Sequence, residues 1–241
     1  MGVVSDKARF SGLQRKEEVS VLASASFVGK LHSGGLSALA WKRPPPVACG
    51  SMTREKLIDF LQRADLINGP QATEIARSFA PLQLRKNEVL QPFGRVSDAY
   101  FFLDQGLLRA FVQDAEGNEV TTRFYSSGHV ALDASSFFNR TPAQQQIHAL
   151  TPCQGWVLSY QQLNTLFHAR PEFREFGRSV LVGALATLQE RMLDQIRETA
   201  RTRYEKLLRT SPAVLQHAPL KYIASYLGVT DSSLSRLRGN A

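Results

Sequence analysis

The sequence of 241 residues has few cysteines and no apolar run that approaches the length of a membrane span. Cys49 and Cys153 lie far apart, so they indicate no disulfide framework, and a reducing cytoplasm is the expected compartment. Iron–sulfur clusters need about four clustered thiolates and zinc sites usually need about four Cys or His ligands, so we predict no metal site and no resident cofactor. A membrane span needs roughly 20 apolar residues, so no membrane partner is predicted.

The motifs of common enzyme classes are also missing. The sequence has no nucleophile elbow, no phosphate-binding P-loop and no zinc-protease helix motif. Glu116 and Glu119 bring two acids close together, but they flank a Gly-Asn turn, where solvated carboxylates are the simpler interpretation. We therefore predict that the protein is not an enzyme.

Positive charge is distributed unevenly along the chain, whose formal net charge is +8. Residues 52–170 hold eleven basic and eleven acidic residues, whereas residues 171–241 hold eleven basic and seven acidic ones. This asymmetry is expected if only the C-terminal third meets nucleic-acid phosphates, although solvated helices can carry a similar excess.

The first 51 residues differ from the rest of the chain. They mix glycine, serine, lysine and arginine without a sustained hydrophobic period, so we predict a disordered leader or a non-native extension at 1–51. The apolar stretch at 19–28 follows two glutamates and is broken by serines, unlike a signal-peptide core. Met52 opens a regular helical pattern and is a candidate natural start.

The hydrophobic period changes at about residue 80. Residues 52–79 have helical spacing that is interrupted at Asn68-Gly69-Pro70. Short runs rich in valine, phenylalanine and tyrosine follow, with glycine turns at Gly106 and Gly117. The runs are Val89–Phe93, Ala99–Leu103, Leu107–Val112, Val120–Tyr125, Gln146–Ala149 and Gly155–Leu158. Their number and spacing predict an antiparallel barrel or sandwich.

Pro171 opens a long helix that is predicted to run to about Leu208. Four of its apolar residues keep a 4-3-4 spacing, which predicts a seam for another helix: Leu181, Leu185, Leu188 and Met192. Gln195 and Thr199 continue the register with polar side chains, so the seam weakens toward the C-terminus. The stripe could be buried against the barrel of the same chain or against a second copy. Because the long helix joins the barrel to a helical hairpin, we favour a homodimer.

The C-terminal part of the sequence predicts two helices joined by a tight turn, over residues 220–227 and 231–238. Ile223, Ala224 and Leu227 share one helical face, and Gly228 suits the point where the chain must turn with positive φ. Thr230 is a candidate N-cap for the second helix.

The second helix has an inner and an outer face. Leu234 and Leu237 point inward. The outer residues are small or basic: Ser232, Ser235, Arg236 and Arg238. A helix with such a face fits the major groove of DNA, although the same pattern could belong to an ordinary helical hairpin.

The order of helix, barrel, seam helix and helical hairpin resembles the Crp/Fnr family of bacterial transcription regulators. The likeness covers residues 52–241 and is most specific at 203–208, 223–230 and 233–238, with weaker matches at 102–109, 128 and 147–150. The resemblance implies an α+β fold with an antiparallel β jelly roll of the cyclic-nucleotide-binding type, a long dimerisation helix and a winged-helix-like helix-turn-helix. The implied domains are a sensor at 52–170, the dimerisation helix at 171–200 and a short DNA-binding domain at 201–241.

The resemblance also assigns DNA-contacting positions. Ser232, Ser233 and Arg236 fall where family members touch base edges or nearby phosphates. A guanidinium can bond guanine O6 and N7 together, so Arg236 is the strongest candidate for base reading. Lys221 and Arg238 are better suited to gripping phosphates.

Cyclic-nucleotide binders of this family carry a glycine-rich turn, a Glu for the ribose and an Arg for the phosphate. Gly128 and Asp133 could be remnants of this cassette, whereas Ala143 and Gln144 occupy the neighbourhood of the missing Arg. An uncharged pocket cannot offset the desolvation of a phosphodiester, so we expect an effector pocket near Gly128, Asp133 and Gln144 that does not take a cyclic nucleotide.

Three functions remain in competition. The favoured one is a homodimeric cytoplasmic transcription regulator whose barrel signal shifts the long helices and so re-aims the reading helices. Its implied partners are DNA, a second copy of the chain, a small-molecule effector and RNA polymerase. The second is a small-molecule-binding signalling module that no longer reads DNA, because Asp231 at the start of the reading helix repels phosphate. An enzyme is the third and has no motif to support it.

Overall fold

The computed structural model describes residues 52–239, so the predicted leader at 1–51 lies outside the described residues. Two short helices, α1 (Glu55–Gln62) and α2 (Gly69–Arg77), precede eight strands. The strands are β1 (Ala80–Leu84), β2 (Val89–Gln91), β3 (Tyr100–Gln105), β4 (Leu108–Gln113), β5 (Glu119–Tyr125), β6 (His129–Ala131), β7 (Gln146–Ala149) and β8 (Cys153–Leu158).

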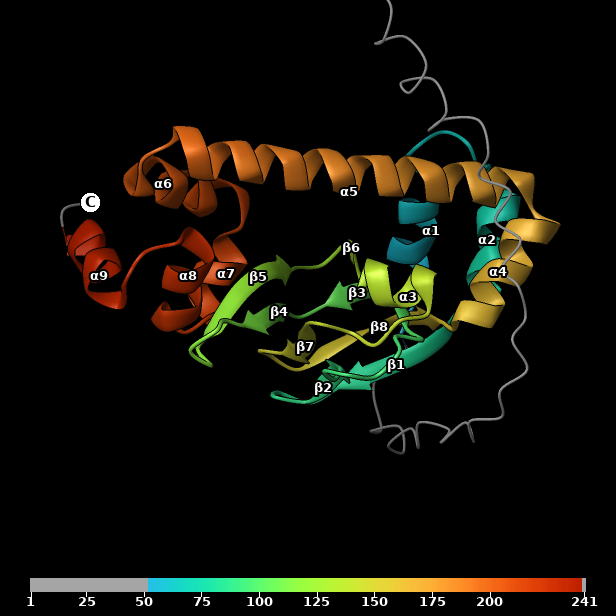
Figure 1. The fold of residues 1–241 in the computed structure, drawn as a ribbon. Coiled ribbons are helices and arrows are strands. Elements are labelled where there is room, and N and C mark those ends of the chain that lie inside the picture. Colours follow the sequence, from blue (N-terminus) through green and yellow to red (C-terminus); the bar gives the residue numbers. More distant parts are fainter. Residues whose placement is uncertain (1–51, 240–241) are drawn as a thin grey trace, which may run out of the picture. The chain divides into compact units, whose positions relative to one another are not determined.

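The strands form two antiparallel four-stranded sheets, with the orders β1-β8-β3-β6 and β2-β7-β4-β5 (Figure 1). This eight-stranded arrangement is a jelly roll, so the predicted antiparallel barrel or sandwich is confirmed. The space between the sheets is filled mainly by apolar side chains, among them Phe101, Leu103, Leu108, Ala110, Tyr125, Ile147 and Val157. Alternation along each strand sends the intervening side chains to the outer faces.

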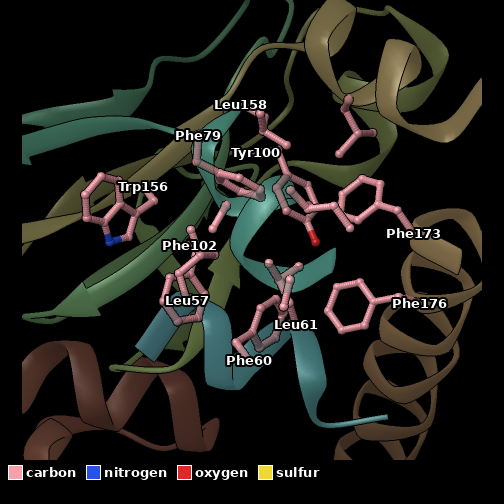
Figure 2. Close-up of a cluster of buried hydrophobic side chains, with 14 of the residues drawn as sticks. Leu57, Phe60, Leu61, Phe79, Tyr100, Phe102, Trp156, Leu158, Phe173 and Phe176 are labelled. Carbon is pink, nitrogen blue, oxygen red and sulfur yellow. The ribbon is translucent and has the colours of Figure 1, made fainter. Parts of the chain in front are cut away.

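Helices cover the outer face of the β1-β8-β3-β6 sheet. Phe102 of β3 lies 4.8 Å from Phe60 of α1 between ring centroids, and Phe60 lies 5.2 Å from Phe176. Figure 2 shows Phe173 and Phe176 projecting from a helix toward this cluster. These contacts anchor the N-terminal helices and the start of the long helix on the barrel.

The predicted hairpin turns are confirmed. Gly106 has a φ of 106°, and a Cβ there would lie 2.5 Å from the sulfur of Cys153, so the turn accepts only glycine. Gly117 has a φ of 86° in the turn between β4 and β5. Strand β2 ends two residues before its predicted end. Its last side chain, Gln91, donates to the carbonyls of Pro92 and Arg95, and this loop geometry replaces strand pairing.

Five further elements were not predicted from the sequence: β1, β6, α3 (Ala134–Asn139), α4 (Tyr160–Ala169) and α7 (Pro212–His217). β1 contains Pro81, which is tolerated because β1 is an edge strand of its sheet. β6 has three residues, too few for an alternating pattern to stand out. Helix α4 begins at a capping box formed by Ser159 and Gln162.

The prediction of one helix from Pro171 to about Leu208 was wrong. The helix α5 (Pro171–Arg197) ends before Glu198, whose backbone is extended, with φ −102° and ψ 149°. Thr199 then caps a new helix, α6 (Ala200–Thr210), because its side chain accepts a hydrogen bond from the backbone of Thr202. The remaining helices are α7 (Pro212–His217), α8 (Leu220–Leu227) and α9 (Asp231–Gly239). Within residues 52–239, no helix is both long and apolar enough to cross a bilayer.

Candidate nucleic-acid interface and sensor barrel

The helical hairpin α8–α9 has the geometry that the sequence predicts. Ile223, Ala224 and Leu227 of α8 are buried together with Leu234 of α9. Gly228 has a φ of 68° and ends α8 in the left-handed conformation. The side chain of Thr230 accepts a hydrogen bond of 3.3 Å from the backbone N–H of Ser233, so the predicted cap is confirmed. The turn thereby fixes the direction in which α9 leaves α8.

The outer face of α9 consists of side chains that are free to meet a ligand. Ser232, Ser235, Arg236 and Arg238 are exposed, and Ser233 is half-buried beside Thr230. The Nε of Arg236 donates to the carbonyl of Ser232 at 3.4 Å. No ion pair formed within residues 52–239 includes Arg236 or Arg238. Two guanidinium groups without carboxylate partners therefore lie on this face.

Two other charged residues of the hairpin, Lys221 and Asp231, lie in the first turns of α8 and α9. Lys221, in the first turn of α8, is exposed, and its ammonium group lies 5.1 Å from the centroid of the Tyr222 ring. Asp231 is exposed in the first turn of α9, where a carboxylate stabilises the helix dipole. Because Asp231 is exposed to water, its carboxylate can stabilise the helix dipole without an ion pair to another described residue.

The apolar stripe of α5 is not covered by the barrel of the same chain. The exposed fractions are 43% for Leu181, 66% for Leu185, 50% for Leu188 and 58% for Met192. The first turns of the same helix are buried through Phe173 and Phe176, so the exposed stripe begins beyond these anchored turns. Of the two ways to bury the stripe that the sequence left open, packing against its own barrel is therefore not what the chain does.

The polar residues that continue this register turn to the helical hairpin instead. Gln195 donates to the carbonyl of Tyr226 in α8 at 3.4 Å, and Thr199 caps α6. The contacts of α5 with the C-terminal helices begin at Arg191, beside Met192 at the end of the stripe.

The predicted effector-pocket residues have local structural roles. Gly128 has a φ of 84°, and its backbone N–H donates to the carbonyl of Leu103 at 2.8 Å. The buried carboxylate of Asp133 caps α3 by accepting a hydrogen bond from Ser136. Gln144 is exposed, whereas its neighbour Ala143 is buried. The assignment of these three residues to an effector pocket stays a prediction.

Arg140 follows α3 in a loop, with a φ of 56°. Its guanidinium donates to the carbonyl of Ser97 at 2.6 Å and lies 4.3 Å from the centroid of the Tyr160 ring. It also pairs at 3.5 Å with Asp98. Arg140, the arginine nearest the predicted phosphate-binding cassette, therefore holds α3 and the loop that follows it in place.

The histidines and the cysteine of the barrel do not assemble. The His129 ring contacts Ser126, the His148 ring lies beside Phe111, and the Cys153 thiol is buried with a pKa raised by desolvation. Within residues 52–239, no group of three His, Cys, Asp or Glu side chains could hold a metal ion.

One charged residue that the sequence analysis did not single out is fully buried. The side chain of Arg109, in β4, has 0% exposure. Its Nη1 lies 2.6 Å from the carboxylate of Glu119, and its Nε donates to the hydroxyl of Thr121 at 2.9 Å. The guanidinium carbon lies 3.5 Å from the centroid of the Tyr222 ring in α8. The sequence did contain one signal for this buried residue, because Arg109 interrupts the otherwise apolar run Leu107–Val112.

A comparison with known protein families finds a match in the central part of the chain. Residues 81–170 match the family model described as "Cyclic nucleotide-binding domain". None of the curated proteins searched matches the sequence.

Solved structures with similar folds come from bacterial regulators. FixK2 from Bradyrhizobium japonicum is 18% identical with a TM-score of 0.58, over 67% of this chain and 83% of that one. The c-di-GMP-responsive global regulator CLP from Xanthomonas campestris is 12% identical with a TM-score of 0.57, over 72% and 91%. A regulator of the Crp/Fnr family from Eubacterium rectale is 13% identical with a TM-score of 0.58, over 76% and 87%. Together with its jelly roll, long helix and helical hairpin, these findings show that the chain has the same fold as these regulators and that its residues 81–170 are similar to a cyclic nucleotide-binding domain.

Proposed function

We propose that the protein is a homodimeric DNA-binding transcription regulator of the Crp/Fnr type that acts in the cytoplasm. The observation that carries this proposal is the outer face of α9, where Arg236 and Arg238 are exposed and form no ion pair with any described carboxylate. A helix of nine residues that presents small hydroxyl side chains around an arginine can enter the major groove of DNA.

The exposed stripe of α5 supports a dimer built from two copies of this helix. Leucines and a methionine at 4-3-4 spacing are complementary to the same stripe on a second copy, and water contact with them is unfavourable. A twofold axis along α5 would offer two α9 helices to half-sites about 34–36 Å apart. Paired reading helices raise affinity over what a single short helix achieves.

The effector of the barrel is proposed to be a small molecule other than a cyclic nucleotide. The interior cluster is apolar, Ala143 is buried where a phosphate-binding arginine is expected, and Arg140 is engaged by backbone carbonyls and Asp98. A phosphodiester buried there would lack the cationic partner that its desolvation requires. The bound signal would shift α5 and α9 and so alter recruitment or exclusion of RNA polymerase.

Selection of bound genomic DNA fragments by the purified protein tests the function. We expect enrichment of a twofold-symmetric sequence and loss of its discrimination in Arg236→Ala. A Lys221→Ala variant should weaken binding to all sequences and reduce the slope of log affinity against log salt by about 0.9, the value for one phosphate contact. Arg178→Ala is the matched control, because Arg178 is an exposed arginine near the barrel end of α5 and remote in sequence from α9.

The competing function is a signalling module that binds a small molecule without reading DNA. Exposed Asp231 at the beginning of α9 favours it, because this carboxylate faces the phosphates that the helix would approach. Failure to enrich any sequence, together with an affinity that Arg236→Ala does not change, would establish this alternative.

A further inference from the structure

The core of the helical hairpin is shared with the barrel. The buried cluster around α6–α9 contains Leu107 and Leu150, which belong to the turns at the ends of β4 and β7. Phe124 of β5 packs against the same cluster, with its ring centroid 5.1 Å from that of Tyr226. The hairpin thus completes its apolar core with side chains of the sensor barrel.

Hydrogen bonds fix the register of this contact. The hydroxyl of Ser225 in α8 donates to the hydroxyl of Thr121 in β5 at 2.8 Å and accepts from the Thr121 backbone N–H at 3.2 Å. Arg191 of α5 bridges the same elements, because its guanidinium donates to the carbonyls of Thr122 and Tyr226. Figure 1 shows α8 next to β5, in agreement with these bonds.

Arg109 lies at the centre of the contact. Its guanidinium is enclosed by the Tyr222 ring, the Phe111 ring, Thr121 and Glu119, and it has no exposed surface. Its Nη2 is buried without a hydrogen-bond partner among the described residues. Removal of one partner from a buried ion pair is strongly destabilising, so the contacts of Glu119 and Tyr222 with this guanidinium are costly to lose.

We propose that Arg109, together with the Thr121–Ser225 pair, positions the reading helix α9 by holding α8 on the outer face of β4 and β5. The inference rests on the proposed function where DNA is the readout, but the docking itself is measurable without DNA. Because α9 is tied to α8 through Gly228 and Leu234, release of α8 from β4 and β5 would leave α9 without a fixed orientation relative to the barrel.

The first test compares the full-length protein with Arg109→Met, which keeps an unbranched, flexible stem and removes the guanidinium with its charge and donors. We expect faster amide hydrogen exchange in α8 and α9 with unchanged protection of β3 and β8. Affinity for the selected DNA should fall about tenfold if only about a tenth of the molecules remain docked. The control is Arg123→Met, the same substitution on β5 at a guanidinium that lies over Tyr125 and, within residues 52–239, forms no hydrogen bond or ion pair with α8.

A cross-link separates positioning from general stability. The hydroxyls of Thr121 and Ser225 are 2.8 Å apart, so cysteines at both positions are within reach of a disulfide. In the Arg109→Met background, Thr121→Cys with Ser225→Cys should restore DNA affinity and the protection of α8 when oxidised, and lose both when reduced. Peptide mapping verifies the bond against the native Cys49 and Cys153.

Three results would overturn the proposal. Unchanged exchange in α8 and α9 of Arg109→Met would show that Arg109 does not hold the hairpin. Failure of the verified cross-link to restore affinity would show that orientation is not what the variant lost. Tighter DNA binding by Arg109→Met would show that docking is inhibitory. If the parent protein binds no DNA, the proposed function fails, while the exchange data still decide whether Arg109 holds α8.

Discussion

The exposed stripe of α5 allows the dimer to be tested with a defined magnitude. Leu185 is 66% exposed in the single chain. Complete burial of a leucine contributes roughly 1.5–3 kcal/mol, so covering the exposed two-thirds contributes roughly 1–2 kcal/mol per copy. A twofold axis places the residue in the interface twice. Leu185→Ala should therefore weaken the dimer by roughly 2–4 kcal/mol, or about 30-fold to 1,000-fold in the dissociation constant.

Sedimentation equilibrium over a range of protein concentrations measures this constant. Leu208→Ala is the matched control, because Leu208 is also exposed, at 41%, but lies on α6 outside the stripe. We expect the control to leave the dissociation constant unchanged. A parent protein that stays monomeric at all concentrations, or equal effects of the two substitutions, would refute the assignment of the stripe as the dimer seam.

Three further predictions concern the hairpin and its contact with the barrel. Gly228→Ala should lower the free energy of unfolding by roughly 1–2 kcal/mol in chemical denaturation, because φ is 68° there and a Cβ would lie 3.2 Å from the Gln195 side chain. Thr230→Ala should lower it by about 1 kcal/mol and Thr230→Ser by much less, since the serine hydroxyl can still cap α9. Desolvation and the nearby Arg109 lower the pKa of His148. As the pH falls, His148 is therefore protonated in the unfolded chain before it is protonated in the folded protein. Stability should therefore fall as pH drops below about 6.5, the unfolded value, and His148→Gln should flatten that fall in thermal melts between neutral and mildly acidic buffers.

Local signals explain which elements could be predicted from the sequence. Gly228 and Thr230 mark the helical hairpin α8–α9 in the sequence, because positive φ and N-capping each demand particular residue types. The break after Arg197 has no comparable marker, since Glu198 and Thr199 are both compatible with a continuing helix. The capping role of Thr199 becomes decisive only because α6 packs beside α8.

The contact centred on Arg109 could not be derived from sequence spacing. Arg109 and Tyr222 are brought together by the packing of α8 on the barrel, and neither residue belongs to a motif. Alternation along β4 places Arg109 on the face opposite Leu108 and Ala110, but alternation alone cannot show what covers that outer face. Long-range packing of this kind depends on the tertiary arrangement and leaves no periodic trace in the chain.

Strand β4 contacts the barrel interior with one face and the helical hairpin α8–α9 with the other. Leu108 and Ala110 lie in the interior cluster, while Arg109 between them holds Tyr222. A ligand can shift the docking equilibrium only by the ratio of its affinities for the two states, and a hundredfold ratio corresponds to about 2.7 kcal/mol. That exceeds the roughly 2 kcal/mol of a desolvated cation–π contact such as the one between Arg109 and Tyr222. The Thr121–Ser225 hydrogen bonds and the apolar contacts of Leu107, Leu150 and Phe124 also hold α8, so a ligand with this preference would weaken the docking of α8 without releasing it.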